Sequence, residues 1–231
     1  MTQPSKTTLI NREMRMADLV LNNPALLLLM ENLEMDFLLH DYTVAQLCEQ
    51  NGISEVVFIM LGNIYNGHDP AQEERAAITG EDLPVVIEYL KRCHRYYKEE
   101  QYPAISSLIK ELQNHNDAPE IRLVEEFFAG YFGEVLEHLD YEDEIAFPYI
   151  CRLLQGVAGK GSAEKFSVQE YRDHHTDIES KLSDLKALLL QHIEVKGDRK
   201  ARRRLLMALA ELENDLVIHS LIEEQILIPV V

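Results

Sequence analysis

HLDYEDEIAFP (residues 138–148) and HSLIEEQILIP (residues 219–229) are the two stretches of sequence that decide the fold. In both, a histidine is followed by a glutamate four residues later and by a proline ten residues later. Positions i and i+4 lie on the same face of an α-helix, so each stretch places a His beside a Glu. Chance rarely produces an internal correspondence of this kind. The repeat therefore predicts two helices that contribute to one site.

Apolar residues continue on either side of both stretches with spacings that alternate between four and three, as on a helix face that lines a bundle core. Two further segments show the same pattern. The four stripes are Ile87, Leu90, His94, Tyr97, Gln101; Val124, Phe128, Tyr131, Val135, His138, Glu142, Ile145, Tyr149; Val168, Tyr171, His175, Ile178, Leu182, Leu185, Leu189; and Leu205, Leu209, Leu212, Leu216, His219, Glu223, Ile226, Val230.

The four stripes predict four long helices, over residues 82–112, 119–154, 163–193 and 199–228. Each is about 30 residues long, and short breaks rich in Gly, Pro or Asn separate them. Sustained two-residue alternation, the signal of a β-strand, is nearly absent. The predicted fold class is therefore all-α, with an antiparallel up-down-up-down four-helix bundle.

A small helical domain is expected before the bundle. Residues 14–65 indicate three or four short helices, and the polar stretch His68–Gly80 is typical of a linker. We therefore predict an N-terminal domain with its linker over residues 1–80 and the bundle over residues 81–231.

The composition excludes several classes of partner. A net charge of −18 leaves no basic face for nucleic acid or for an anionic membrane surface. The apolar run at residues 25–30 is too short to cross a bilayer, and it does not follow the basic-then-apolar order of a secretory signal. The cysteines are scattered, without a CxxC motif, which favours a reduced, cytoplasmic protein. They are Cys48, Cys93 and Cys151.

Six polar residues on the stripes predict a metal centre. A single His on an apolar helix face is more often a hydrogen-bonded core residue, but here no Lys or Arg lies on the stripes near the two glutamates. Burying two unpaired carboxylates would cost several kcal/mol each, and bound cations remove that cost. The candidate ligands are His94, His138, Glu142, His175, His219 and Glu223.

The kind of metal follows from the donor atoms. Imidazole and carboxylate without thiolate suit iron, manganese or zinc. Six ligands are too many for one tetrahedral zinc and too few to saturate two octahedral ions. Two bridging carboxylates with about two histidines on each ion would leave open positions for a small ligand.

Residues 83–231 resemble the haemerythrin-like (HHE) di-iron family, and more narrowly the iron–sulfur cluster repair proteins called Repair of Iron Centres. The resemblance rests on H…HxxxE…H…HxxxE and on Pro103, Phe147, Pro148 and Pro229. It implies two non-haem, carboxylate-bridged iron ions held by the six candidate residues. On the third helix, Ile178 three residues later matches the family pattern to His175 and not to His174.

The N-terminal domain resembles the leading domain of the same proteins. Asn23-Pro24, Met35-Asp36-Phe37, Thr43–Cys48 and Asn51-Gly52-Ile53 follow its pattern in order. Leu38-Leu39 stands where the family carries an adjacent Cys-Cys pair. Thiol chemistry that depends on that pair is therefore not expected in this chain.

Three further residues are weaker candidates for the site. Glu179 follows His175 by four residues and is a candidate seventh ligand, although an exposed Glu is the commoner case. His174 lies about 100° around the helix from His175, and His115 falls at a break between helices. The three stripe tyrosines are expected to be core residues, of which one could hydrogen-bond a bound ligand.

The expected function is repair of iron–sulfur clusters or a response to nitrosative or oxidative stress. Its partners would be dioxygen or nitric oxide and damaged iron–sulfur proteins, and a homodimer is a further candidate assembly. The alternative is a protein that binds or senses dioxygen or nitric oxide without turnover. The resemblance to the repair proteins favours the first function.

Overall fold

The computed structural model describes residues 9–115, 119–156, 168–193 and 199–230. Over these ranges the regular elements are all helices, which confirms the all-α prediction. The chain divides into two compact units, residues Met1–Arg92 with Leu221–Val231, and residues Cys93–Ser220. The domain boundary predicted near residue 80 lies inside the first unit and stays a prediction.

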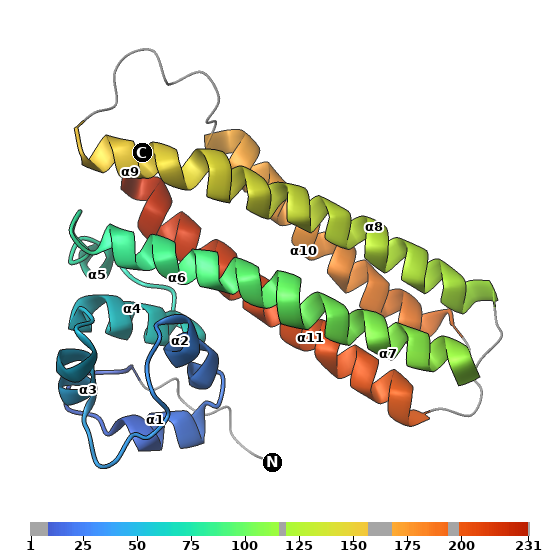
Figure 1. The fold of residues 1–231 in the computed structure, drawn as a ribbon, viewed down its shortest axis with the longest axis horizontal. Coiled ribbons are helices and arrows are strands. Elements are labelled where there is room, and N and C mark those ends of the chain that lie inside the picture. The colour runs from blue at the N-terminus through green and yellow to red at the C-terminus, as the bar shows by residue number, and fades with distance from the viewer. Residues whose placement is uncertain (1–8, 116–118, 157–167, 194–198, 231) are drawn as a thin grey trace. The chain divides into compact units, whose positions relative to one another are not determined.

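The second unit contains the greater part of the four-helix bundle, and successive long helices run in opposite directions (Figure 1). The first long helix is α6 (Leu83–Tyr96), η1 (Tyr97–Gln101) and α7 (Tyr102–His115). The second is α8 (Pro119–Tyr141), η2 (Glu142–Ala146) and α9 (Phe147–Leu154). The third is α10 (Val168–Gln191), and the fourth is α11 (Arg199–Ile222), η3 (Glu223–Leu227) and η4 (Ile228–Val230).

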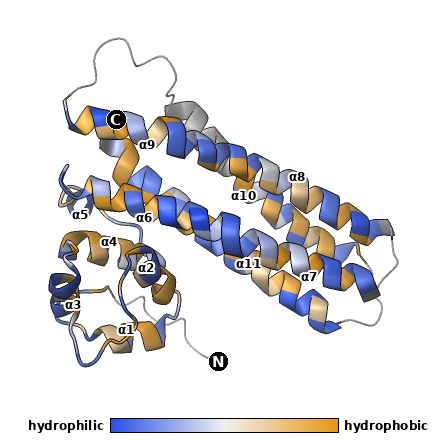
Figure 2. Cartoon of the chain, in the orientation of Figure 1, coloured by the Kyte–Doolittle hydropathy of each residue, from blue (hydrophilic) through white to orange (hydrophobic). Residues whose placement is uncertain are grey.

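Apolar and polar residues alternate along each of these helices, as the stripes predict (Figure 2). Phe128, Val135, Leu182 and Leu209 are all at most 1% exposed. Burial of a side chain of this size contributes about 1.5–3 kcal/mol, so the stripes supply the main stabilisation of the bundle.

Three short π-helices interrupt the bundle helices, and each one ends two residues before a proline. The pairs are Gln101 and Pro103, Ala146 and Pro148, and Leu227 and Pro229. Proline has no N–H to donate and crowds the carbonyl four residues earlier, and a wider π-turn relieves both problems. The feature that the three π-turns share in the sequence is therefore a proline two residues after the turn.

The π-turn in the second helix changes which residues are buried after it. The predicted stripe continues through Ile145 and Tyr149, but both are only half-buried. Ala146 and Ile150 are buried in their place, at 1% and 3% exposure. One extra residue in the turn rotates the following side chains by about one position, so this part of the predicted stripe was wrong.

The first unit begins with α1 (Met16–Asn22), α2 (Leu26–Asn32), α3 (Val44–Asn51), α4 (Glu55–Tyr65) and α5 (Gln72–Arg75). A capping box between Thr43 and Gln46 starts α3, and Gly52 ends it in the left-handed conformation at φ 65°. Within this unit the Tyr65 and Tyr89 hydroxyls lie 2.7 Å apart, and Arg92 contacts Glu34 at 2.5 Å.

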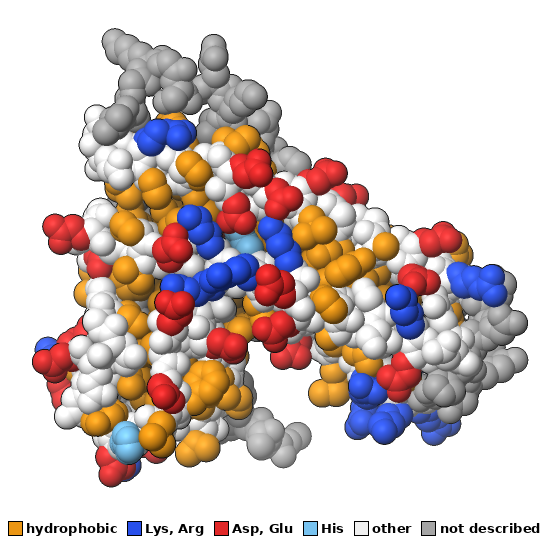
Figure 3. All heavy atoms as spheres, in the orientation of Figure 1, with side chains coloured by type: hydrophobic (Ala, Val, Ile, Leu, Met, Phe, Trp, Pro, Cys, Tyr) orange, Lys and Arg blue, Asp and Glu red, His pale blue; other side chains and the backbone are white. Residues whose placement is uncertain are grey.

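The charge of the chain is unevenly distributed along it. Five of its basic residues fall in the run Arg199–Arg204 at the start of α11, where Arg204 pairs with Glu111 at 2.8 Å. Elsewhere on the face shown in Figure 3, acidic and basic side chains are interspersed. No helix in the described ranges has the length and apolarity that crossing a membrane requires.

Candidate metal centre

Five of the six candidate ligands lie where α-helix gives way to π-turn. His94 lies two residues before α6 ends at Tyr96, and His138 lies in the last turn of α8. Glu142 is the first residue of η2. His219 likewise lies in the last turn of α11, and Glu223 is the first residue of η3. The repeated stretches thus place their His and Glu at equivalent structural positions.

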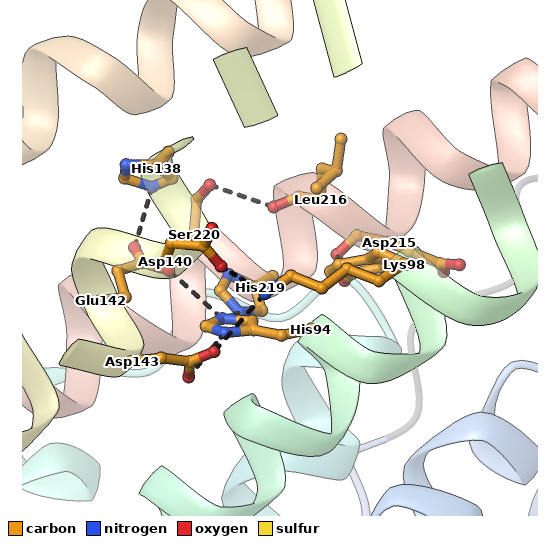
Figure 4. A network of polar contacts seen from close by, with 11 residues as sticks. His94, Lys98, His138, Asp140, Glu142, Asp143, Asp215, Leu216, His219 and Ser220 are labelled. Atoms are coloured by element: carbon orange, nitrogen blue, oxygen red, sulfur yellow. Dashed lines mark hydrogen bonds and ion pairs between the residues drawn. The ribbon is translucent and has the colours of Figure 1, made fainter. Parts of the chain in front are cut away.

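Glu142 is the centre of the contacts that the structure shows (Figure 4). Its Oε1 lies 2.8 Å from Nε2 of His138, and its Oε2 lies 3.2 Å from Nε2 of His94. The carboxylate is fully buried. One carboxylate therefore presents each of its oxygens to a different imidazole.

The His219 ring completes the arrangement from the fourth helix. Its Nε2 lies 3.0 Å from Nε2 of His94. Together with Glu142 and Glu223, these two histidines form a group in which one ligand atom from each residue lies within 4.8 Å of all the others. All four residues are at most 4% exposed.

The second nitrogen of His94 is turned away from this group. Its Nδ1 lies 3.0 Å from Oδ1 of Asp143, whose other oxygen lies 3.7 Å from Nζ of Lys98. Burial lowers the pKa of His94, but the contacts with Asp143 and Glu142 outweigh burial and raise that pKa to about 9. The contacts with the two acids therefore favour the protonated form of the His94 imidazole.

Aromatic side chains cover the histidine rings. Phe147 stacks on His94 with ring centroids 5.6 Å apart, and Tyr97 meets His219 edge-on at 5.8 Å. The Tyr97 hydroxyl donates to the backbone carbonyl of Asp215 at 3.1 Å. Tyr97 is thus a buried packing residue with a hydrogen-bonded tip, as its position on the stripe predicts.

Asp215 is a buried acid one turn before His219. Asp215 is 6% exposed, and its Oδ2 has no hydrogen-bond partner among the described residues. Burial raises its pKa to about 7, and nearby Glu211 adds to the effect, while the Asn214 side chain opposes it. Ionisation of the Asp215 carboxyl in the folded protein therefore costs free energy.

Four of the six predicted ligands are in the group, and His138 contacts it through Glu142. The sixth, His175, lies on α10, but its side chain is outside the described residues. The side chains of His174 and Glu179 on α10, and of His115 at the end of α7, also lie outside the described residues, so these assignments stay predictions.

Sequence reasoning did not identify Asp143, Lys98 or Asp215. An acid directly after Glu142 was visible in the repeat, but nothing in its spacing showed which histidine it would face. Lys98 follows His94 by four residues, which was the available signal for a shared helix face. Asp215 lies next to Leu216 of the stripe, and its burial could not be foreseen.

The donor set fits a bound cation. Two imidazole nitrogens at 3.0 Å and two buried carboxylates converge on one small region, and carboxylate and imidazole together are typical ligands of iron, manganese and zinc. His94 has the orientation usual for a metal-binding histidine, in which the second nitrogen faces a carboxylate. A buried His/Glu group that can hold metal is therefore present.

Comparison with known families agrees with this geometry. Residues 85–231 match the model described as the Hemerythrin HHE cation binding domain. No curated protein matches the chain significantly. Because the match spans more than half of the chain, this protein belongs to the haemerythrin HHE cation-binding domain family.

Proposed function

We propose that the chain is a non-haem di-iron protein. The observation that carries the proposal is Glu142, whose two oxygens face two different imidazoles at 2.8 and 3.2 Å in a fully buried position. A carboxylate in that position can join two ions, one on each side. The repeat and the burial of Glu223 support the same role for the second carboxylate. The proposed ligands are His94, His138, Glu142, His175, His219 and Glu223.

Two irons at this site would supply open positions for dioxygen or nitric oxide and a store of transferable metal. The chain itself supplies the donors, their orientation and a dry environment. Phe147 and Tyr97 cover the His94 and His219 rings. Because Asp143 and Glu142 favour the protonated form of His94, binding of a metal at Nε2 would release a proton from that nitrogen.

For the biological role we propose repair of iron–sulfur clusters in the cytoplasm under nitrosative or oxidative stress. The resemblance of both parts of the sequence to the Repair of Iron Centres proteins supports this role. The partners would be a diatomic ligand and a damaged iron–sulfur protein, to which iron is returned. The low number of carboxylates does not favour bulk iron storage.

One observation favours a second candidate, a protein that binds or senses dioxygen or nitric oxide. Leu38 and Leu39 occupy the places of the cysteine pair, and they are 66% and 9% exposed. The first unit therefore lacks that thiol pair, and a carrier or sensor does not need it. In such a protein the metals stay in place while the small ligand exchanges.

The two roles are separated by whether iron leaves the protein. We would mix the iron-loaded chain with an apo iron–sulfur acceptor and sulfide, and follow acceptor activity against an equal amount of free iron. Repair predicts faster reactivation than free iron gives. Reactivation at the free-iron rate, together with reversible binding of dioxygen or nitric oxide, would favour the sensor.

A further inference from the structure

We propose that Asp143 is a positioning residue that holds the His94 ring with Nε2, and not Nδ1, facing the metal group. The inference rests on the proposed di-iron function. His94 Nδ1 lies 3.0 Å from Asp143 Oδ1, while Nε2 lies 3.2 Å from Glu142 and 3.0 Å from His219 (Figure 4). An imidazole has two ring nitrogens, so engaging Nδ1 with a carboxylate leaves only Nε2 for a metal.

Lys98 holds the Asp143 carboxylate in that position. Its Nζ lies 3.7 Å from Asp143 Oδ2 and 2.7 Å from Asp140 Oδ1. Asp143 thus uses one oxygen for His94 and turns the other toward Lys98. His94 and Lys98 come from the first helix and Asp143 comes from the second, so Asp143 contacts two side chains of the neighbouring helix.

Among the described residues, this contact occurs in one half of the sequence repeat. Asp143 directly follows Glu142, and Glu224 directly follows Glu223. Glu224 is half-buried and contacts no histidine whose side chain the structure describes. Within the described part of the chain, the two stretches therefore supply matching ligands, and the first also supplies an acid that contacts a histidine.

The consequence concerns how tightly iron is held. A carboxylate on the second nitrogen fixes the ring and makes the metal-binding nitrogen more basic, and loss of such a partner costs about 10- to 100-fold in metal affinity. We therefore expect Asp143→Ala to speed iron release to a chelator by about that factor. Asp143→Asn keeps an acceptor oxygen without the charge and should lie between Asp143→Ala and the wild type.

The test uses the iron-loaded full chain and two matched controls. Asp140→Ala removes the same charge beside the same lysine without touching His94, and Glu224→Ala removes the equivalent acid of the second stretch. Both should release iron at the wild-type rate. The second readout is the exchangeable ring N–H proton resonance of His94, which exchanges slowly with solvent in the wild type and quickly in Asp143→Ala.

The outcomes are distinct. Faster release and faster N–H exchange in Asp143→Ala alone would support the positioning role, provided that its helicity by circular dichroism is unchanged. Release at the wild-type rate with an unchanged resonance would overturn the role and leave the di-iron function standing. If the wild type itself takes up no iron, the proposed function fails, and this inference fails with it.

Discussion

At the scale of single residues, the structure places acids and imidazoles in contact with one another. Glu142 lies between His138 and His94, and His94 lies between Glu142 and Asp143. The helix periodicity of the sequence was sufficient to put His and Glu on common faces. It could not supply the direction of a side chain, so the contact of Asp143 with His94 appears only in the structure.

The bridging role gives a prediction for single carboxylates. Glu142→Ala and Glu223→Ala should each lose most of the bound iron, because a bridging carboxylate holds both ions. Glu179→Ala should lose little. Iron content after gel filtration measures all three. If Glu179→Ala proves as damaging as the other two, the third helix supplies a seventh ligand.

Asp215 gives a prediction about pH. Its folded pKa of about 7 lies above the ordinary value of 3.8, so the folded state binds a proton that the unfolded state releases between these values. Stability should therefore fall as pH rises through that window. Asp215→Asn cannot ionise, so it should stabilise the protein above pH 7 by roughly 2–4 kcal/mol and change little at pH 4.

Urea unfolding of the metal-free protein at pH 4 and pH 8 measures this difference. The comparison of wild type with Asp215→Asn at each pH cancels the titration of His94, which both proteins share. Equal gains at the two pH values would show that the substitution acts through packing and not through ionisation.

At the scale of the helices, the sequence predicted the order and approximate length of the four bundle helices because their periodicity is long and regular. It missed the change of register after Glu142, because the stripe was extended with ordinary α-helical spacing. The prolines are visible in the sequence. A proline can break, kink or widen a helix, and the apolar pattern does not tell which of these occurs. The structure shows that it widens.

The π-turn after Glu142 gives a prediction for Pro148. Pro148→Ala restores an N–H and removes the crowding, so η2 should revert toward α-helix and turn Glu142 away from one of its histidines. Iron retention should fall while total helicity stays the same. Pro84→Ala, at the exposed start of α6, is the matched control and should keep its iron. A Pro148→Ala structure with an intact π-turn and full iron content would show that the core, and not the proline, sets the turn.

At the scale of the whole molecule, the three cysteines are far apart in the sequence and poorly exposed. Cys48 is 1% exposed, and burial, with a contribution from Glu55, raises its pKa to about 12. Cys93 is also buried, and Cys151 is half-buried. The N-terminal domain should therefore contribute no redox-active thiol pair.

Thiol titration under native conditions tests this expectation. Cys151 should react first, and Cys48 and Cys93 should react only after unfolding, because a buried neutral thiol is a poor nucleophile. Mass mapping after mild oxidation should find no intramolecular disulfide. A disulfide that includes Cys48 would restore the thiol chemistry that Leu38-Leu39 argues against.

The central claim is that the buried His/Glu group holds a di-iron centre, and the most direct test is the metal content of the intact chain. Protein produced in iron-replete medium should contain two irons per chain, and Glu142→Ala produced in the same way should have lost most of that iron. Elemental analysis with Mössbauer spectroscopy gives both the number of irons and whether they are coupled through a bridge. One zinc per chain with no iron would contradict the account.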